Sequence, residues 1–279
     1  QRHDLASGPG VEGAGDLGYA LDAVADAPLE RFVRDVGRAR PVTLIAEGPG
    51  RLSAAPDVEG SQAAVRVLVD PVDGTRPLML DMRSAWVLTG VAPDRGEATR
   101  LSDVTLAVQT ELPTTSARVY HVLSALRGGG ATLARHDVAT GECLDQRPLR
   151  VPDDAPVDNG FFSFTRYLPA ERPFVAALEQ AFLGRALPAL GLDPRLLYED
   201  QYLCTAGQLF LLATGRYRLL ADLRARLAAQ EEVAGFAAKP YDLSTLLIAQ
   251  EAGVVVHDAQ GQPLDGPFDT ETALDVVAY

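Results

Sequence analysis

Short apolar runs bounded by Gly, Pro and Asp dominate the first half of the chain and predict β-strands. Rich in β-branched residues, they cover Val42–Ala46, Val65–Val69, Ala85–Val91 and Val104–Gln109. Before them, apolar residues recur at helical spacing from Tyr19 to Val36, which predicts an amphipathic helix. The first half is therefore expected to be mainly a sheet with a helix against it.

The second half mixes both patterns. The stretch "GFFSF" at 160–164 predicts a strand, and helical spacing predicts helices at 169–187, 204–215 and 242–253. The segment 151–160, "VPDDAPVDNG", is dense in Pro, Asp and Gly and is the best candidate boundary. We therefore expect an α/β or α+β protein with an N-terminal subdomain at 1–150 and a C-terminal one at 151–279.

Composition narrows the class of partner. The chain has 279 residues and a formal charge of -13, which argues against a nucleic-acid polymer as partner. No apolar segment is long enough to span a membrane, and no basic stretch followed by an apolar core opens the chain. Two cysteines are too few for a disulfide framework, so a reducing, cytoplasmic setting is expected.

Four acidic residues share one trait, because each stands at the end of an apolar element. Glu47 follows "VTLIA", Asp70 and Asp73 follow "VRVLV", and Asp242 opens a predicted helix. Each has a plainer explanation: a solvated strand end for Glu47, a turn for the two neighbouring aspartates, and an N-cap for Asp242. Converging carboxylates repel one another, however, unless a cation lies between them.

The stretch "VLVDPVDGT", 67–75, favours a metal site. Carboxylates without a nearby His or Cys suit Mg²⁺, with Mn²⁺ as a substitute. Pro71 fixes the backbone so that the Val72 carbonyl could face the same ion, and Gly74 lets the chain bend closely. Thr75 supplies a hydroxyl and a backbone N–H for an anion. This is a layout suited to phosphate hydrolysis.

The order of these motifs resembles the inositol monophosphatase-like sugar phosphatases. "DPVDGT" is similar to their first signature, and "PYDLSTLLIAQEAGVVVHDAQGQPLD" is similar to their second. "LIAEG", "LCTAGQLFLLATGR" and "YALDAVAD" resemble further family segments, and the likeness spans roughly residues 16 to 269.

The resemblance implies a layered α-β-α-β-α sandwich, a homodimer, and Mg²⁺-dependent hydrolysis of a small phosphorylated sugar or polyol. It also implies roles for individual residues. Glu47, Asp70, Asp73, Asp242 and the Val72 carbonyl would bind metal. Gly74, Thr75 and Thr205 would contact the substrate. Thr75, hydrogen-bonded to Asp22, would help to activate the attacking water, with Glu47 as a further catalytic group.

Departures from the family pattern leave the substrate open. Gly48 stands where the family has a second glutamate, and Tyr241 stands where it has tryptophan. Lys239 could pair with a second phosphate, which would favour a bisphosphorylated substrate such as fructose 1,6-bisphosphate or 3′-phosphoadenosine 5′-phosphate; a solvated lysine is the plainer alternative. Gly48 also leaves room for a non-catalytic, ligand-binding member of the fold.

Overall fold

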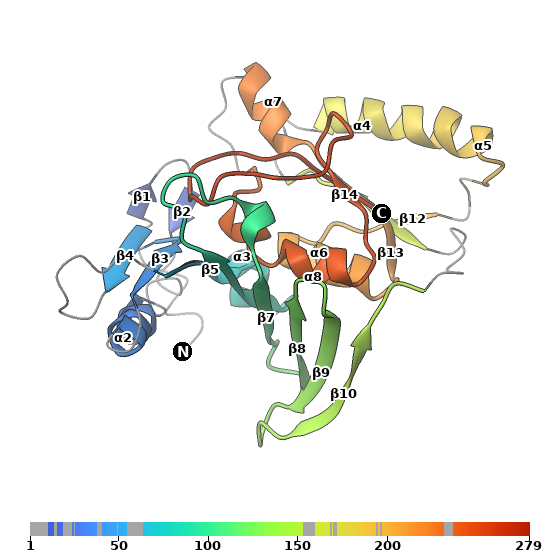
Figure 1. Ribbon diagram of the computed structural model, residues 1–279. Coiled ribbons are helices and arrows are strands. Elements are labelled where there is room, and N and C mark those ends of the chain that lie inside the picture. Colours follow the sequence, from blue (N-terminus) through green and yellow to red (C-terminus); the bar gives the residue numbers. More distant parts are fainter. Residues whose placement is uncertain are drawn as a thin grey trace.

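The computed structural model describes residues 11–13, 16–18, 24, 26–37, 41–48, 50–54, 64–152, 160–167, 169, 172–193, 195, 197–231 and 237–279. Within them, two larger sheets and the helices around them build the fold (Figure 1). None of the described helices combines the length and the apolar character that crossing a membrane would require.

The larger sheet holds eight of the described strands in the order β10-β9-β8-β7-β6-β5-β3-β4. Its neighbours pair antiparallel except β3 and β5, which run parallel. Its strands are β3 (Val42–Ala46), β4 (Gly50–Ala54), β5 (Val65–Asp73), β6 (Ala85–Pro93), β7 (Leu106–Leu112), β8 (Val119–Leu126), β9 (Gly130–Asp137) and β10 (Cys143–Leu149). Near the N-terminus, β1 (Val11–Gly13) and β2 (Asp16–Gly18) form a separate antiparallel pair.

The second sheet has the order β12-β11-β13-β15-β14. Strand β11 pairs parallel with β12 and β13, while β15 pairs antiparallel with β13 and β14. Its strands are β11 (Phe161–Phe164), β12 (Tyr198–Glu199), β13 (Tyr217–Asp222), β14 (Val256–His257) and β15 (Val276–Ala278).

The helices separate and cover these sheets. They are α2 (Asp26–Gly37), α3 (Thr75–Met79), α4 (Arg172–Ala181), α5 (Leu187–Ala189), α6 (Thr205–Ala213), α7 (Arg224–Glu231) and α8 (Leu246–Glu251). Helix α2 packs on one face of the large sheet through Val33. Helices α6 and α8 pack on the other face, and α6 also contacts β13. Val175 of α4 and Leu227 of α7 pack with the far face of the second sheet.

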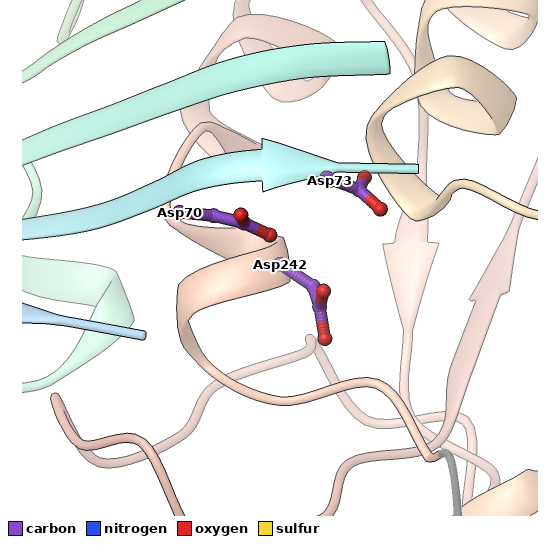
Figure 2. Close-up of side chains that lie close together, drawn as sticks. All are labelled: Asp70, Asp73 and Asp242. Carbon is purple, nitrogen blue, oxygen red and sulfur yellow. The ribbon is translucent and has the colours of Figure 1, made fainter. Parts of the chain in front are cut away.

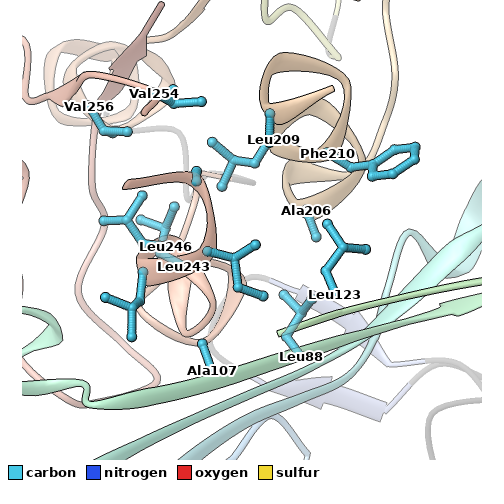
Figure 3. Close-up of a cluster of buried hydrophobic side chains, with 14 of the residues drawn as sticks. Leu88, Ala107, Leu123, Ala206, Leu209, Phe210, Leu243, Leu246, Val254 and Val256 are labelled. Carbon is cyan, nitrogen blue, oxygen red and sulfur yellow. The ribbon is translucent and has the colours of Figure 1, made fainter. Parts of the chain in front are cut away.

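The layer order is therefore helix, sheet, helix, sheet, helix, and the predicted α-β-α-β-α sandwich is confirmed. The core between the sheets explains why α6 is apolar nearly all round: every residue of it except Leu211 is buried. Figure 3 shows Leu88, Ala107 and Leu123 of the large sheet facing the side chains of α6 and the segment before α8. Apolar burial on both sides stabilises this middle layer, at roughly 25 cal/mol per Å².

The predicted elements agree with the structure in part. Strand β3 has the predicted bounds, but β5 continues four residues further, to Asp73, and β7 begins at Leu106 after a 3₁₀ turn at Leu101–Asp103. Asp242 is not the N-cap of α8; Thr245 holds that place. The predicted start of the first helix, 19–23, and most of the predicted boundary, 153–159, lie outside the described residues.

Candidate metal centre

A bulge at the end of β5 brings its two aspartates toward the same side. Residues three apart on a regular strand point to opposite faces. Here Asp70 pairs with Leu88 and Asp73 with Trp86, so β5 uses three residues where β6 uses two. The extra residue in β5 turns the Asp73 side chain to the same side of the strand as that of Asp70. The Val72 N–H donates to Asp70 Oδ1 over 2.9 Å, which fixes the first carboxylate within the bulge.

The third carboxylate comes from the other half of the chain. Asp242 lies in a 3₁₀ turn, Tyr241–Leu243, that packs against β5. Its carboxylate accepts the backbone N–H of Lys239 over 2.6 Å. Carboxylate oxygens of Asp70, Asp73 and Asp242 all lie within 4.8 Å of one another (Figure 2). The structure thus brings together three of the four acids that the sequence singled out.

Burial disfavours the ionised form of all three carboxylates. Burial, followed by the charges of Glu47, Asp73 and Asp242, holds the pKa of Asp70 well above its usual value. Burial also raises the pKa of Asp73, to about 6, and burial together with Asp73 raises the pKa of Asp242. Buried negative charges at such short range are costly unless a cation joins them. An oxygen-only donor set of this kind fits Mg²⁺ or Mn²⁺.

Glu47 lies beside the three-carboxylate cluster rather than within it. Strand β3 runs parallel to β5, with Ala46 paired to Val69, and the Glu47 N–H donates to the Val69 carbonyl over 3.3 Å. Its charge raises the pKa of both Asp70 and Asp242. The next residue, Gly48, has a φ of 84°, a conformation that a glutamate rarely adopts. The missing second glutamate thus coincides with a turn that suits glycine.

The start of α3 carries the predicted phosphate-binding residues. Gly74 is left-handed, with a φ of 96°, and precedes the first turn of α3. The Thr75 hydroxyl donates to the Val72 carbonyl over 2.9 Å, so two predicted site residues contact each other. Asp22, the expected partner of Thr75, lies outside the described residues, and that pairing stays a prediction.

Helix α6 supplies a contact to Asp73 that the sequence did not reveal. The Ala206 N–H donates to Asp73 Oδ2 over 2.6 Å, and the backbone of Thr205 also lowers the pKa of this carboxyl. Cys204 is the N-cap, with its thiol 3.3 Å from the Asp73 carbonyl. Thr205 is itself buried. The predicted contact of Thr205 with the substrate stays a prediction. In the structure, the Thr205 backbone acts on Asp73, the candidate metal ligand.

Lys239 makes hydrogen bonds through both its backbone and its side chain. Its ammonium donates to the Glu271 carbonyl over 2.6 Å, while its backbone N–H contacts Asp242. The lysine thus links the turn that carries Asp242 to the segment before β15. Its predicted contact with a second phosphate stays a prediction.

Arg224 is a further charged residue that the sequence analysis missed. It opens α7 and is only 5 % exposed, and its charge acts on both Asp73 and Asp242. A single Asp-Leu-Arg in a sequence is too common to signal such a position.

Several solved structures with this fold are phosphatases or are described as similar to one. Fructose-1,6-bisphosphatase from Leishmania major matches with a TM-score of 0.70 and 13% identity, over 98% of this chain and 82% of that one. A hypothetical protein from Pyrococcus horikoshii with similarities to inositol-1 monophosphatase matches with a TM-score of 0.60 and 18% identity, over 99% and 85%. Inositol monophosphatase II from Staphylococcus aureus gives 0.58 and 16%, over 92% and 76%.

No protein-family model and no curated protein matches the sequence. At these identities the structural likeness establishes the fold alone, which is the fold of these fructose-1,6-bisphosphatase and inositol monophosphatase structures.

Proposed function

We propose that this protein is a Mg²⁺-dependent phosphatase that hydrolyses a small phosphorylated sugar or polyol. The observation that carries the proposal is the convergence of Asp70, Asp73 and Asp242 within 4.8 Å, in a fold shared with inositol and fructose phosphatases. Asp70 and Asp73 are buried and Asp242 is half-buried, so a cation would offset the repulsion among them. The same cation would neutralise part of the charge of a phosphate monoester.

Asp70, Asp73 and Asp242 would hold the metal, with Glu47 beside them and the Val72 carbonyl as a further oxygen donor. Bound there, a divalent cation neutralises phosphoryl oxygens and makes water acidic enough to attack near neutral pH. The carboxylates are already fixed by backbone donors: Val72 for Asp70, Ala206 for Asp73 and Lys239 for Asp242. Ligands held in this way would lose little freedom on binding metal.

Thr75 is the residue best placed to act on the nucleophile. Its hydroxyl donates to the Val72 carbonyl, and a hydroxyl that donates one hydrogen bond can at the same time accept one from a water and so orient it. Gly74 brings the backbone into a left-handed bend immediately before it. Thr75 would therefore orient water, and the backbone at Gly74 and Thr75 would hold the phosphate.

Of the alternatives, a bisphosphorylated substrate depended on Lys239 meeting a second phosphate. The contact of its ammonium with the Glu271 carbonyl does not favour that idea. A non-catalytic role depended on Gly48, whose backbone conformation gives the glycine a structural reason. Neither alternative gains a specific observation, so the monophosphatase proposal stands first.

The test is a phosphate-release panel of sugar, polyol and nucleotide phosphates, run with Mg²⁺ and with excess chelator. We expect Mg²⁺-dependent release that Asp242→Asn reduces by at least a hundredfold, since one ligand is lost. Asp145→Asn, an exposed aspartate on β10, should leave release unchanged. Equal turnover in chelator, or full activity of Asp242→Asn, would contradict the proposal.

A further inference from the structure

A buried glutamine lies on the sheet face that carries Asp70. Gln109 belongs to β7 and is only 2 % exposed. It pairs with Leu88 of β6, and Leu88 pairs in turn with Asp70 of β5, so the three residues form one row across the sheet. Residues paired in this way share a face of the sheet. Gln109 therefore stands on the same face as Asp70, two strands away.

Both ends of the Gln109 amide are hydrogen-bonded. Its Nε2 donates to the carbonyl of Ala206, in the first turn of α6, over 3.1 Å. Its Oε1 accepts the hydroxyl of Thr245 over 3.1 Å. Ala206 and Thr245 are themselves buried. An amide buried without partners is costly, so these two bonds fix the orientation of the Gln109 side chain.

Each of these bonds leads to one of the candidate metal ligands. The Ala206 N–H donates to Asp73 Oδ2 over 2.6 Å, so Ala206 contacts Asp73 through its N–H and Gln109 through its carbonyl. Thr245 follows Asp242 by three residues and is the N-cap of α8, just after the 3₁₀ turn that carries Asp242. The Gln109 amide therefore ties the residue that holds Asp73 to the segment that holds Asp242.

We propose that Gln109 is a positioning residue that keeps Asp73 and Asp242 close enough for a small divalent cation, and so makes the cluster prefer Mg²⁺ over Ca²⁺. This inference rests on the proposed metal centre. The carboxylates repel one another and would move apart without a brace. Mg²⁺ requires oxygen ligands at about 2.0–2.1 Å in a nearly octahedral arrangement, whereas Ca²⁺ accepts about 2.3–2.6 Å and a looser geometry. A wider cluster would therefore lose affinity for Mg²⁺ and keep its affinity for Ca²⁺.

A role confined to stability makes a different prediction. Gln109 lies between Leu88 and Leu123 on the neighbouring strands, and Figure 3 shows both leucines in the core. If Gln109 only filled this place, a leucine there would change the stability of the protein but not its choice of metal. If the amide sets the spacing of the ligands, the ratio of the Mg²⁺ and Ca²⁺ dissociation constants changes although the protein is folded.

The experiment is calorimetric titration of the full chain with Mg²⁺ alone and with Ca²⁺ alone. Gln109→Leu should raise the Mg²⁺ Kd about tenfold, as is usual when a residue that orients a metal ligand is lost, and should leave the Ca²⁺ Kd within about twofold. Thr245→Val, which removes the partner hydroxyl at nearly constant shape, should have the same effect. Thr245→Ser keeps the hydroxyl and should stay within about twofold of the wild type for both ions.

Gln208→Leu is the matched control. Gln208 is a glutamine of α6 with no exposed surface, but its amide lies 3.5 Å from the Ser163 hydroxyl of the second sheet. Losing a buried amide on that side of α6 should leave the Kd of both ions unchanged.

The outcomes are separable. Folded Gln109→Leu with the wild-type ratio of Mg²⁺ and Ca²⁺ Kd overturns the inference and leaves the metal centre standing. If that variant does not fold, the Thr245 variants decide: a selective loss of Mg²⁺ affinity in Thr245→Val but not in Thr245→Ser supports the inference, and any other pattern overturns it. Wild-type protein that binds no Mg²⁺ would instead overturn the proposed function.

Discussion

Asp73 and Ala206 are joined by a 2.6 Å hydrogen bond from the Ala206 N–H to the Asp73 carboxylate, although 133 positions separate them in the chain. The bond ties the end of β5 to the first turn of α6, the helix packed between the two sheets. The positive end of a helix favours a carboxylate. Asp73, a candidate metal ligand, is thus held by the middle layer of the fold. Changes in the packing of that layer should therefore shift the Asp73 carboxylate.

Asp73→Asn should stabilise the protein without metal and abolish the stabilisation that Mg²⁺ gives. Burial raises the pKa of Asp73 to about 6, which means that its ionised form destabilises the fold at pH 7. Removing the charge should add about 1–3 kcal/mol to the unfolding free energy in chelator. Thermal melts with and without Mg²⁺ measure both effects. Asp145→Asn, exposed on β10, is the control and should behave like the wild type.

The stabilisation by Mg²⁺ should depend on pH with a definite sign. The pKa of Asp73 is about 6 in the folded state and 3.8 as its unperturbed value, so its contribution to stability without metal falls as pH rises from about 4 to 6. Metal binds the ionised carboxylate, so the Mg²⁺-induced rise in Tm should grow across the same interval. Melts from pH 4 to 8 measure it. A rise in Tm that is the same at every pH would argue against ligation by these carboxyls.

Gly74→Ala should weaken Mg²⁺ binding in addition to straining the backbone. A Cβ at Gly74 would lie 3.1 Å from the Cys204 Cβ, and the residue has a φ of 96°. Gly96→Ala is the matched control, with a φ of 61° and nothing within 4 Å of the added Cβ. Both should lose about 1 kcal/mol to strain, but only Gly74→Ala should also lose Mg²⁺ affinity. Equal losses of stability, with metal affinity intact, would mean that the α6 contact is unimportant.

Gly90→Ala tests the approach of the Asp242 segment to the large sheet. A Cβ at Gly90 would lie 2.3 Å from the Ser244 carbonyl oxygen, so either β6 or the turn that carries Asp242 must move. We expect weakened Mg²⁺ binding and a stability loss of about 1–3 kcal/mol. Gly184→Ala lies in the helical segment Phe182–Ala186 with no atom within 4 Å of the added Cβ, so it should leave Mg²⁺ binding unchanged and should not lower the stability. Tight Mg²⁺ binding by Gly90→Ala would show that this contact does not position Asp242.

The sequence predicted those parts of the fold whose signal is local. Strand β3 is a short run of apolar and β-branched residues, all of them buried, and its bounds were correct. Strands β8, β9 and β10 were missed; most of their residues are half-buried or exposed, although Leu123 and Ala125 of β8 and Ala131 and Leu133 of β9 alternate into the core. The end of β5 was placed too early, since aspartates and proline normally end a strand, and here they continue it through a bulge.

The candidate site shows the same limit. Asp70, Asp73 and Asp242 could be chosen because each followed or opened an apolar element, and the structure brings them together. The contacts that hold these three carboxylates could not be predicted from the sequence. The Ala206 N–H has no side-chain signature, the partner of the Lys239 ammonium is a backbone carbonyl 32 positions away, and Arg224 belongs to an ordinary Asp-Leu-Arg segment. Such partners depend on how distant elements pack.

The central claim is that Asp70, Asp73 and Asp242 hold a divalent cation. The most direct measurement is a crystal structure of the protein with Mn²⁺, using anomalous scattering to locate the ion. The account predicts an anomalous peak bonded to oxygens of all three carboxylates, at about 2.0–2.3 Å, and its loss in Asp73→Asn. Well-ordered carboxylates with no peak between them at millimolar Mn²⁺, or a peak elsewhere only, would contradict it.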